Sequence, residues 1–227
     1  MAEADDMATA RAVYDASASE YVRAVGTELS PGFETPSGLV VLDTFLAAAA
    51  AVAGPIIDAG CGPGRVAAFV ARRGVHVVGI DASSAMLTQA CAAHPGLALA
   101  QCVLNDLPFV AGSASGVVCW YSIIHTPPHE LDRVFGEVAR VLRPDGGLLV
   151  AFQAGDGQAV ARENAHGTGL TLTSYRHGAE DVVRRLSAAG FSVQTCTVRD
   201  PEFRHETSPQ AFILARRRGS GKVGSSA

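Results

Sequence analysis

From residue 55 onward, short and nearly continuous apolar runs alternate with longer stretches in which apolar residues recur at helical spacing. Apolar runs of this length, bounded by glycine or proline, are typical of strands that are buried on both faces of a sheet. Parallel neighbours need a crossover, so strands that alternate with helices predict a parallel sheet that is covered on both sides. The pattern therefore predicts a doubly wound α/β fold.

Five strands are expected in this alternating part, together with four helices. The third helix has its prolines at its start, where a missing backbone N–H costs least. The strands are expected at residues 55–59, 75–81, 97–103, 116–122 and 146–153, and the helices at residues 64–74, 83–94, 127–143 and 178–191.

The end of the chain has a different order. Two further apolar runs, at residues 192–199 and 210–217, are joined by a loop with no helix between them. Antiparallel strands can share such a loop, whereas parallel strands cannot. We therefore expect a mostly parallel, seven-stranded sheet whose last strand is antiparallel.

The first 54 residues read as helices. Apolar residues recur at helical spacing within residues 9–26, and Ser37 is the expected N-cap of a second helix that ends near residue 53. The chain is accordingly divided into an N-terminal helical cap at residues 1–54, a Rossmann-like core at residues 55–218 and a disordered tail at residues 219–227.

Composition and charge limit the kinds of partner that we expect this protein to bind. The 227 residues carry a net charge of -4 with no basic block before the last few residues, which argues against nucleic acid. The N-terminus lacks signal-peptide features, and no apolar run approaches the roughly 20 residues needed to cross a bilayer. The five cysteines are scattered without CxxC spacing, so we expect a cytoplasmic protein with free thiols and no metal site. A monomer and a homodimer are both open.

The stretch IIDAGCGPGR, residues 56–65, ends an expected strand in three glycines and opens an expected helix. Its spacing is not the dinucleotide fingerprint, because Arg65 stands where the third glycine of G-x-G-x-x-G belongs, and no P-loop Gly-Lys-Ser/Thr follows. The next strand ends in Asp81, where a carboxylate can accept both hydroxyls of a ribose. A nucleoside with a polar, phosphate-free tail therefore fits this turn better than NAD does.

Two more segments support a nucleoside ligand. LNDLPF places Asp106 and Leu107 at the tip of the third expected strand, where an acid can accept from the adenine amino group. Met86, one helical turn after Asp81, can cover one face of the ring.

In order and spacing, five segments resemble class I S-adenosylmethionine-dependent methyltransferases of the small-molecule type. The resemblance runs from about residue 10 to residue 217 and includes the closing strand pair. It implies transfer of a methyl group to an O, N, S or C atom of a small-molecule acceptor, with S-adenosyl-L-methionine as the cofactor. The matching segments are IIDAGCGPG, VVGIDASSAML, LNDLPF, VVCWYSIIH and RVLRPDGG.

The resemblance also implies roles for single residues. The glycine turn and Asp58 would hold the methionine part of the cofactor, with Cys61 as a structural member of the turn. Tyrosines of the opening helix would close over the cofactor. The implied cofactor-binding set is Tyr14, Tyr21, Asp58, Ala59, Gly60, Cys61, Gly62, Asp81, Ala82, Met86, Asp106, Leu107, Tyr121 and Ser122.

His125 is the candidate catalytic residue. It follows the fourth expected strand, at the edge where open α/β sheets bind ligands, and the ordinary pKa of histidine suits a general base. The alternative is a histidine that packs or hydrogen-bonds beside the cofactor. Residues 161–181 have the length and glycines of a lid, and we expect His166, Tyr175 and His177 to contact the substrate there, unless they are exposed or capping residues.

Two other functions stay open at this point. An NAD-dependent oxidoreductase is disfavoured by Arg65 and by the closing strand pair. A cofactor-binding module without transfer activity is not favoured, because every expected cofactor position is filled.

Overall fold

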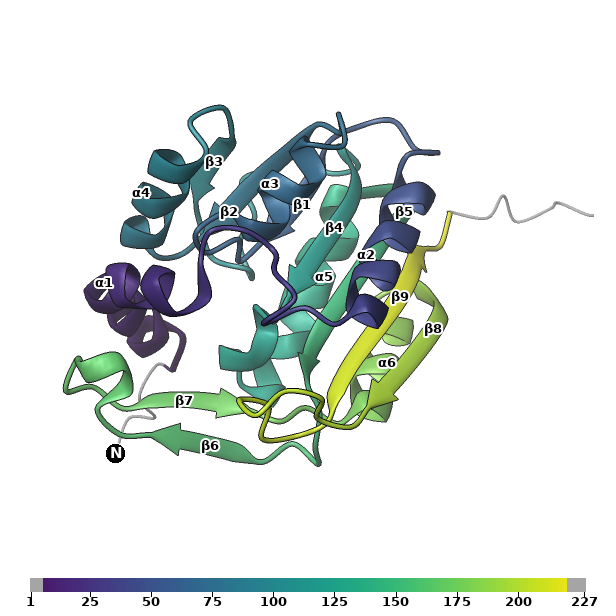
Figure 1. Cartoon of the computed structure of the whole chain (residues 1–227). Helices are drawn as coiled ribbons and strands as arrows, with labels where there is room; N and C mark the ends of the chain where they lie inside the picture. The colour runs from purple at the N-terminus through teal and green to yellow at the C-terminus, as the bar shows by residue number, and fades with distance from the viewer. Residues whose placement is uncertain (1–5, 220–227) are drawn as a thin grey trace, which may run out of the picture.

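The computed structural model describes residues 6–219. Its centre is a seven-stranded sheet in the order β3-β2-β1-β4-β5-β9-β8, shown in Figure 1. The strands are β1 (Ile56–Ala59), β2 (Val77–Asp81), β3 (Ala98–Gln101), β4 (Ala114–Trp120), β5 (Leu142–Gln153), β8 (Phe191–Arg199) and β9 (Gln210–Arg217).

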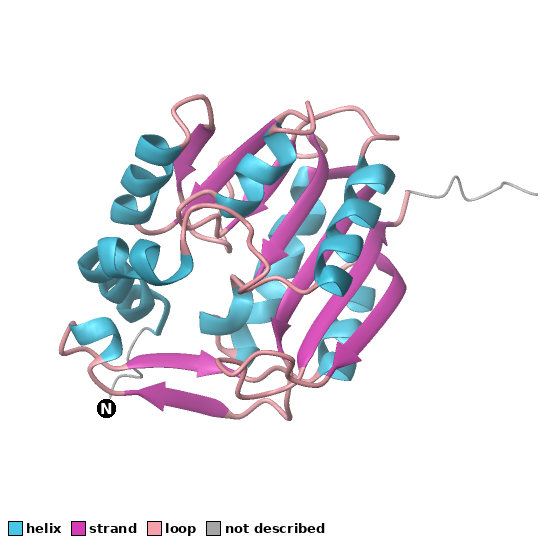
Figure 2. Ribbon diagram, viewed as in Figure 1, coloured by secondary structure: helices cyan, strands magenta, loops and turns pink. Residues whose placement is uncertain are grey.

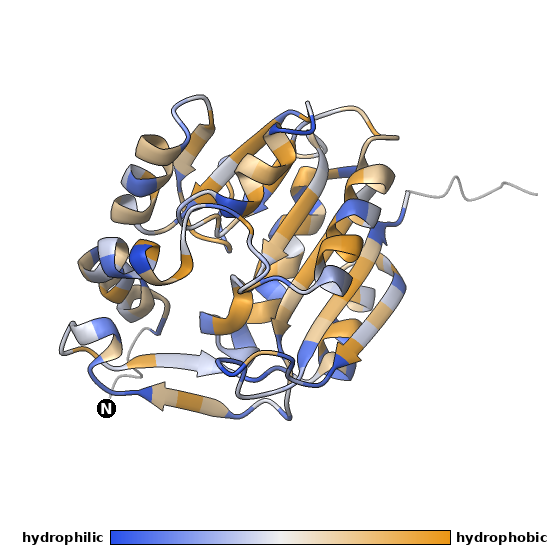
Figure 3. Ribbon diagram, viewed as in Figure 1, coloured by the Kyte–Doolittle hydropathy of each residue, from blue (hydrophilic) through white to orange (hydrophobic). Residues whose placement is uncertain are grey.

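The direction of the strands confirms the predicted fold class. Strands β1 to β5 pair in parallel, whereas β9 runs antiparallel to both β5 and β8. All seven residues of β4 are buried or nearly so, which is the reason for its continuous apolar sequence. Hydrophobic residues therefore concentrate along the central strands in Figure 3.

Helices cover both faces of this sheet. Apolar side chains of α2 (Pro36–Ala49) and α3 (Arg65–Ala71) form one core with β1, β2, β4 and β5, and those of α5 (Leu131–Val141) and α6 (Ala179–Ala188) form the other. The remaining helices are α1 (Asp6–Val25) and α4 (Ser84–Ala93), which pack against each other at the β3 edge.

Helix α2 covers one face of the main sheet and shares its hydrophobic core. The expected domain boundary at residue 54 would therefore separate this helix from the sheet that it covers. Its Phe45 lies over two glycines of the sheet, and a Cβ atom at Gly116 would stand 2.8 Å from the ring. The expected N-cap was also wrong, because Thr35 caps the helix by accepting from the N–H of Gly38 at 3.1 Å. The end of the expected tail, residues 220–227, lies outside the described residues.

One element was not expected. The segment between β5 and α6 forms a two-stranded antiparallel sheet of β6 (Ala159–Arg162) and β7 (Leu172–Tyr175), which stands apart from the main sheet in Figure 2. This β6–β7 hairpin packs against α1 through Leu172, Ala10 and Val13. The hairpin occupies the segment whose length predicts a lid, and its role as a lid stays a prediction. Short 3-10 turns complete the chain at η1 (Ile123–His125), η2 (Pro128–Glu130) and η3 (Ala165–Gly167).

Candidate active site

A cavity of about 490 Å³ opens at the carboxyl edge of the sheet, under α1. Ligands of open α/β sheets bind at this edge. The walls come from α1 and from the loops that follow β1 to β4. They are formed by Met7, Ala8, Ala10, Arg11, Tyr14, Tyr21, Gly60, Gly62, Asp81, Ala82, Ser83, Met86, Cys102, Val103, Leu104, Asn105, Trp120, Tyr121, Ser122, Ile124, His125 and Thr126.

The glycine turn after β1 needs its glycines for two reasons. Gly60, Gly62 and Gly64 all have positive φ angles, of 80°, 52° and 85°. A Cβ atom at Gly60 would stand 2.3 Å from the Cβ of Ser122, so no larger residue fits there. The turn is held against β2 by the N–H groups of Gly60 and Cys61, both of which donate to the Ile80 carbonyl at 2.8 Å.

Asp81 links this turn to the tip of β2. Its Oδ2 accepts from the N–H of Gly62 and its Oδ1 from the N–H of Ser83, each at 2.8 Å. A carboxylate oxygen has two lone pairs, so each oxygen can accept one more hydrogen bond. Burial raises the pKa of Asp81, and the backbone hydrogen bonds oppose this shift. The remaining acceptor positions at the cavity wall suit a pair of neighbouring hydroxyl groups.

Asp58 presents a buried acceptor without a partner. The side chain is 1% exposed, and its Oδ2 accepts from the N–H of Ala67 at 2.8 Å, at the start of α3. Among residues 6–219, its Oδ1 has no hydrogen-bond partner. Burial raises the pKa of Asp58 to about 7, with a further contribution from the charge of Asp81. Because an unpaired buried carboxylate is costly, a cationic group of a ligand would stabilise it.

Helix α1 brings aromatic rings and one histidine contact to the cavity. The hydroxyl of Tyr14 lies 2.9 Å from Nε2 of His125, and Nδ1 of His125 lies 2.7 Å from the carbonyl oxygen of Thr173 in β7. A carbonyl only accepts, so Nδ1 carries the proton and Nε2 accepts from Tyr14. Burial lowers the pKa of His125, which keeps the ring neutral at pH 7.

The structure brings nine of the expected cofactor residues together at the cavity wall, and His125 joins them. Asp58 and Cys61 lie behind the wall, buried with Ala59. Asp106 and Leu107 are not part of the wall: Asp106 is exposed, and Leu107 packs in the main core. The nine residues are Tyr14, Tyr21, Gly60, Gly62, Asp81, Ala82, Met86, Tyr121 and Ser122.

The three expected substrate residues have different surroundings. The ring of His166 lies 6.2 Å from the rings of both Tyr14 and Tyr21, at the tip of the hairpin over α1. Tyr175 donates to the carboxylate of Asp6. His177 is 2% exposed and hydrogen-bonds through Nε2 to a backbone carbonyl, so we no longer expect it to reach a substrate.

Several residues of the cavity wall were not predicted from the sequence, and two groups of them have a clear structural origin. Met7, Ala10 and Arg11 share one face of α1 with Tyr14, at the spacing i, i+3, i+4 and i+7, so the helical period could have found them. The loop after β3 contributes residues 102–105 instead of Asp106 and Leu107, because β3 ends at Gln101.

Two features are absent from the part of the chain that the structure describes. None of the helices within residues 6–219 is both long and apolar enough to cross a membrane. In the same range, no three His, Cys, Asp or Glu side chains are grouped so that they could hold a metal ion.

Residues 56–146 match the protein family described as Methyltransferase domain. The chain contains a class I, S-adenosylmethionine-dependent methyltransferase domain. The matched stretch starts at β1 and ends inside β5, so it contains the glycine turn, Asp81 and His125. The family resemblance predicted from the sequence is thereby confirmed.

A curated relative of this domain is the malonyl-[acyl-carrier protein] O-methyltransferase of Erwinia billingiae (strain Eb661). It is 33% identical over 101 residues, which cover 44% of this chain and 39% of the relative. The chain thus spans about two fifths of the length of that protein.

Two solved structures share the fold of the domain over most of the chain. Magnesium protoporphyrin IX methyltransferase from Synechocystis PCC 6803, with bound SAM, has a TM-score of 0.68 at 19% identity and covers 96% of this chain and 99% of its own. The [4+2]-cyclase SpnF has a TM-score of 0.68 at 20% identity, and the match covers 92% of this chain and 94% of the cyclase. At such identities the likeness establishes the fold alone.

The first prediction concerns Asp58, whose ionisation in the folded protein costs stability. Its pKa is higher in the folded than in the unfolded chain, so its stabilising contribution is lost as pH rises from about 4 to about 7. At pH 8, Asp58→Asn should therefore raise the free energy of unfolding of the ligand-free protein by about 1–3 kcal/mol. Urea unfolding at pH 5 and pH 8 measures this.

The control is Asp200→Asn, which makes the same exchange at an exposed carboxyl. It should leave the free energy of unfolding unchanged at both pH values. An Asp58→Asn protein that is less stable than the wild type at pH 8 would contradict the assigned burial cost.

Proposed function

We propose that this protein transfers a methyl group from S-adenosyl-L-methionine to a small-molecule acceptor. The observation that carries the proposal is the placing of two carboxylates on either side of one glycine turn, with Asp58 buried and Asp81 half-buried at the cavity wall. One carboxylate suits a cation and the other a pair of hydroxyls. The cofactor carries an amino group and a ribose at opposite ends of its sulfonium centre, so this charge pattern fits it.

The residues present fit the cofactor. The unpaired Oδ1 of Asp58 would accept from its amino group, directly or through water, beside the N–H groups of the glycine turn. Asp81 would accept from the ribose hydroxyls. Met86 and the loop after β3, including Leu104 and Asn105, would enclose the adenine ring; the amide oxygen of Asn105 offers the hydrogen-bond acceptor that we first expected from the carboxylate of Asp106.

When bound, the cofactor supplies an activated methyl group on sulfur, so the protein has mainly to position the acceptor in line and exclude water. The rings of Tyr14 and Tyr21 stand edge to face, with their centroids 5.7 Å apart. With His166 they close the cavity on the side of α1.

His125 would act as the base when the acceptor keeps a proton. Its Nε2 lone pair points to the hydroxyl of Tyr14, and the oxygen of Tyr14 keeps a lone pair for a second donor. A proton from the acceptor would pass to the Tyr14 oxygen as the hydroxyl proton of Tyr14 passes to His125. The carbonyl of Thr173 holds the ring in the tautomer that this transfer requires.

An oxidoreductase that binds NAD is less well supported. A pyrophosphate needs cations or free backbone N–H groups near the turn. Arg65 is instead paired with the buried Glu34, with 2.7 Å between Nη2 and Oε1. The structural likeness to a cyclase makes a protein of this fold without methyl transfer the second candidate.

Several further features belong to the same proposal. The acceptor is a small molecule, since the cavity has a volume of about 490 Å³ and lies under α1. The relative from Erwinia billingiae is named as an O-methyltransferase, which supports an oxygen acceptor. The five thiols are free in the structure, which supports the cytoplasm as the compartment.

The second prediction tests the cofactor site. Asp81→Asn should weaken S-adenosylmethionine binding at least tenfold, because the amide cannot accept from both ribose hydroxyls. Isothermal titration calorimetry measures this, with Asp200→Asn as the matched control of unchanged affinity. The wild type should bind S-adenosylmethionine and not NAD, and tighter binding of NAD would overturn the proposed function.

The third prediction concerns the Tyr14–His125 pair. His125→Ala should lower the turnover number roughly 100-fold or more, with less than a threefold change in cofactor affinity. Tyr14→Phe keeps the ring and removes the hydroxyl, so it should also lower turnover. Because burial holds the pKa of His125 below the ordinary histidine value of about 6.5, wild-type turnover should fall only at a pH below that ordinary value.

These variants require an acceptor, which a screen of small acids, phenols, amines and thiols for cofactor-dependent methylation would supply. If turnover and cofactor affinity fell together in His125→Ala, the histidine would be a wall of the cavity and not a base.

A further inference from the structure

Buried polar atoms without partners are concentrated beside the active site. Such atoms are rare in proteins, and each calls for an explanation. Three of them lie near one another at the ends of β5, β7 and the loop before β9. They are Oε1 of Gln153, Nη1 of Arg176 and Oγ of Ser208.

Strand pairing and hydrogen bonds place these three residues at one short segment. The Nη2 of Arg176 donates to Oγ1 of Thr207 at 2.9 Å, immediately before Ser208. Gln153 pairs with Gln210 across β5 and β9, and Nε2 of Gln210 donates to the carbonyl of Ser208 at 2.7 Å. The three unpaired atoms therefore surround residues 207–210 at the carboxyl edge of the sheet.

This edge continues the active site. Strand β5 lies next to β4, and the N–H of Tyr121, at the end of β4, donates to the carbonyl of Ala151 in β5 at 2.8 Å. The ring of Tyr121 lines the cavity and lies 6.4 Å from that of Phe212 in β9. The unpaired atoms thus lie beyond Tyr121, on the side away from the nucleoside end of the cavity.

The charges of this region do not cancel. Arg199 is paired with the buried Glu206 at 2.5 Å, and Arg65 is paired with Glu34. Arg176 is 7% exposed and takes part in no ion pair among residues 6–219. Burial and the charge of Arg162 both lower the pKa of Arg176, so a second cation lies near it.

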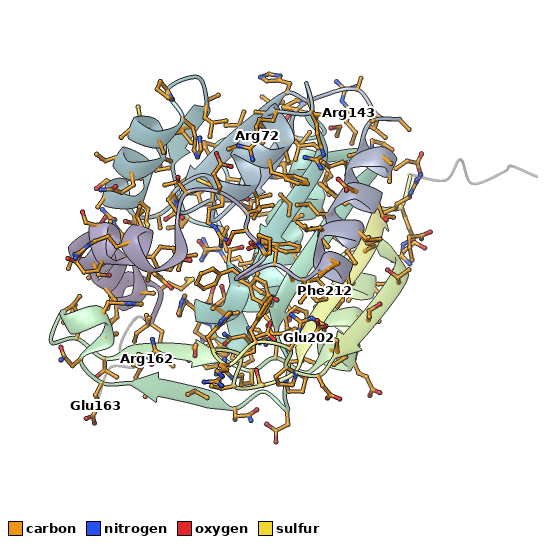
Figure 4. All side chains as sticks on the ribbon, viewed as in Figure 1. Arg72, Arg143, Arg162, Glu163, Glu202 and Phe212 are labelled. Atoms are coloured by element: carbon orange, nitrogen blue, oxygen red, sulfur yellow. The ribbon has the colours of Figure 1, made fainter. Side chains whose placement is uncertain are left out.

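Both arginines belong to one face of the β6–β7 hairpin. Arg162 lies opposite Leu172, and the alternation of side chains along β7 places Arg176 on the face of Leu172. Leu172 packs on Ala10 and Val13 of α1, and Ala10 lines the cavity. Figure 4 shows Arg162 near the end of the hairpin below α1, far from Arg143 at the opposite edge of the molecule.

We propose that the acceptor carries a carboxylate, which Arg176 binds in this region. An acid would supply the partner that Nη1 lacks and would neutralise the buried guanidinium, while Gln153 and Ser208 offer further hydrogen bonds. Arg176 is the buried cation of this pair, whereas Arg162 is exposed and screened by water, so one buried charge matches a carboxylate better than a phosphate dianion. The proposal rests on the proposed methyl transfer and names the class of its acceptor.

The test compares acids with their neutral amides on the wild-type protein, saturated with S-adenosylhomocysteine. The pairs are benzoate and benzamide, 4-hydroxybenzoate and 4-hydroxybenzamide, and indole-3-acetate and indole-3-acetamide; their planar bodies suit a cavity lined by Tyr14, Tyr21, Trp120 and Tyr121. Ligand-observed NMR titration gives the affinities. In at least one pair the acid should bind at least tenfold more tightly than the amide, and more tightly than phenyl phosphate.

Variants then locate the effect. Arg176→Gln should reduce the preference for the acid to less than twofold, and Arg176→Lys should restore part of it. Ser208→Ala, which removes only an unpaired hydroxyl, should weaken binding of the acid about threefold and leave the protein folded. Arg143→Gln makes the same exchange at an exposed arginine and should change nothing.

Equal affinities of acid and amide in all three pairs would overturn the proposal, and so would an acid preference that survives Arg176→Gln. Preference for phenyl phosphate would overturn the choice of a carboxylate. Cofactor binding is measured separately, so a protein that binds S-adenosylhomocysteine but prefers no acid refutes this inference alone. A protein that does not bind S-adenosylhomocysteine refutes the proposed function.

Discussion

The active site depends on the hydrogen bond between the N–H of Gly62 and the carboxylate of Asp81, which joins the turn after β1 to the tip of β2. The bond fixes a turn whose glycines have positive φ angles, and at Gly60 the side chain of Ser122 leaves no space for a larger residue. It also holds a carboxylate at the cavity wall with acceptor capacity left over. Together with the bond from the N–H of Ser83, it gives the carboxylate of Asp81 a defined direction.

The second carboxylate, that of Asp58, lowers the stability of the ligand-free protein at the same edge of the sheet. Asp58 lies behind the turn, close enough to Asp81 for each charge to disfavour the other, and one of its oxygens has no partner. A site built this way is stabilised by a ligand that brings a cation, so ligand binding and local stability are coupled. Helix α1 is held over this edge because Asp15 accepts from the hydroxyl of Ser83 at 2.7 Å, and Tyr14 donates to His125.

Local patterns predicted most of this site, since the glycine turn and Asp81 are set by residues adjacent in sequence. Long-range packing was harder to predict. Helix α2 is alanine-rich, and its role as a layer depends on Phe45 meeting Gly116, which no local pattern reports. The hairpin was missed because β6 is fully exposed and so lacks apolar alternation. Asp106 was misplaced because β3 is short, which brings the residues before it to the cavity wall.

The residues proposed to bind the acceptor come from a different part of the chain than those proposed to bind the cofactor. The cofactor residues sit on strand ends that the whole fold class shares, whereas Arg162, His166 and Arg176 belong to an insertion between β5 and α6. His166 and Asn164 have positive φ angles of 51° and 46°, a conformation that costs energy for residues other than glycine. Packing of His166 against Tyr14 and Tyr21 offsets that cost only when the hairpin lies on α1. The hairpin is thus seated on α1 by two rings that line the cavity, and with the proposed acceptor site this seating would couple acceptor recognition to the exclusion of water.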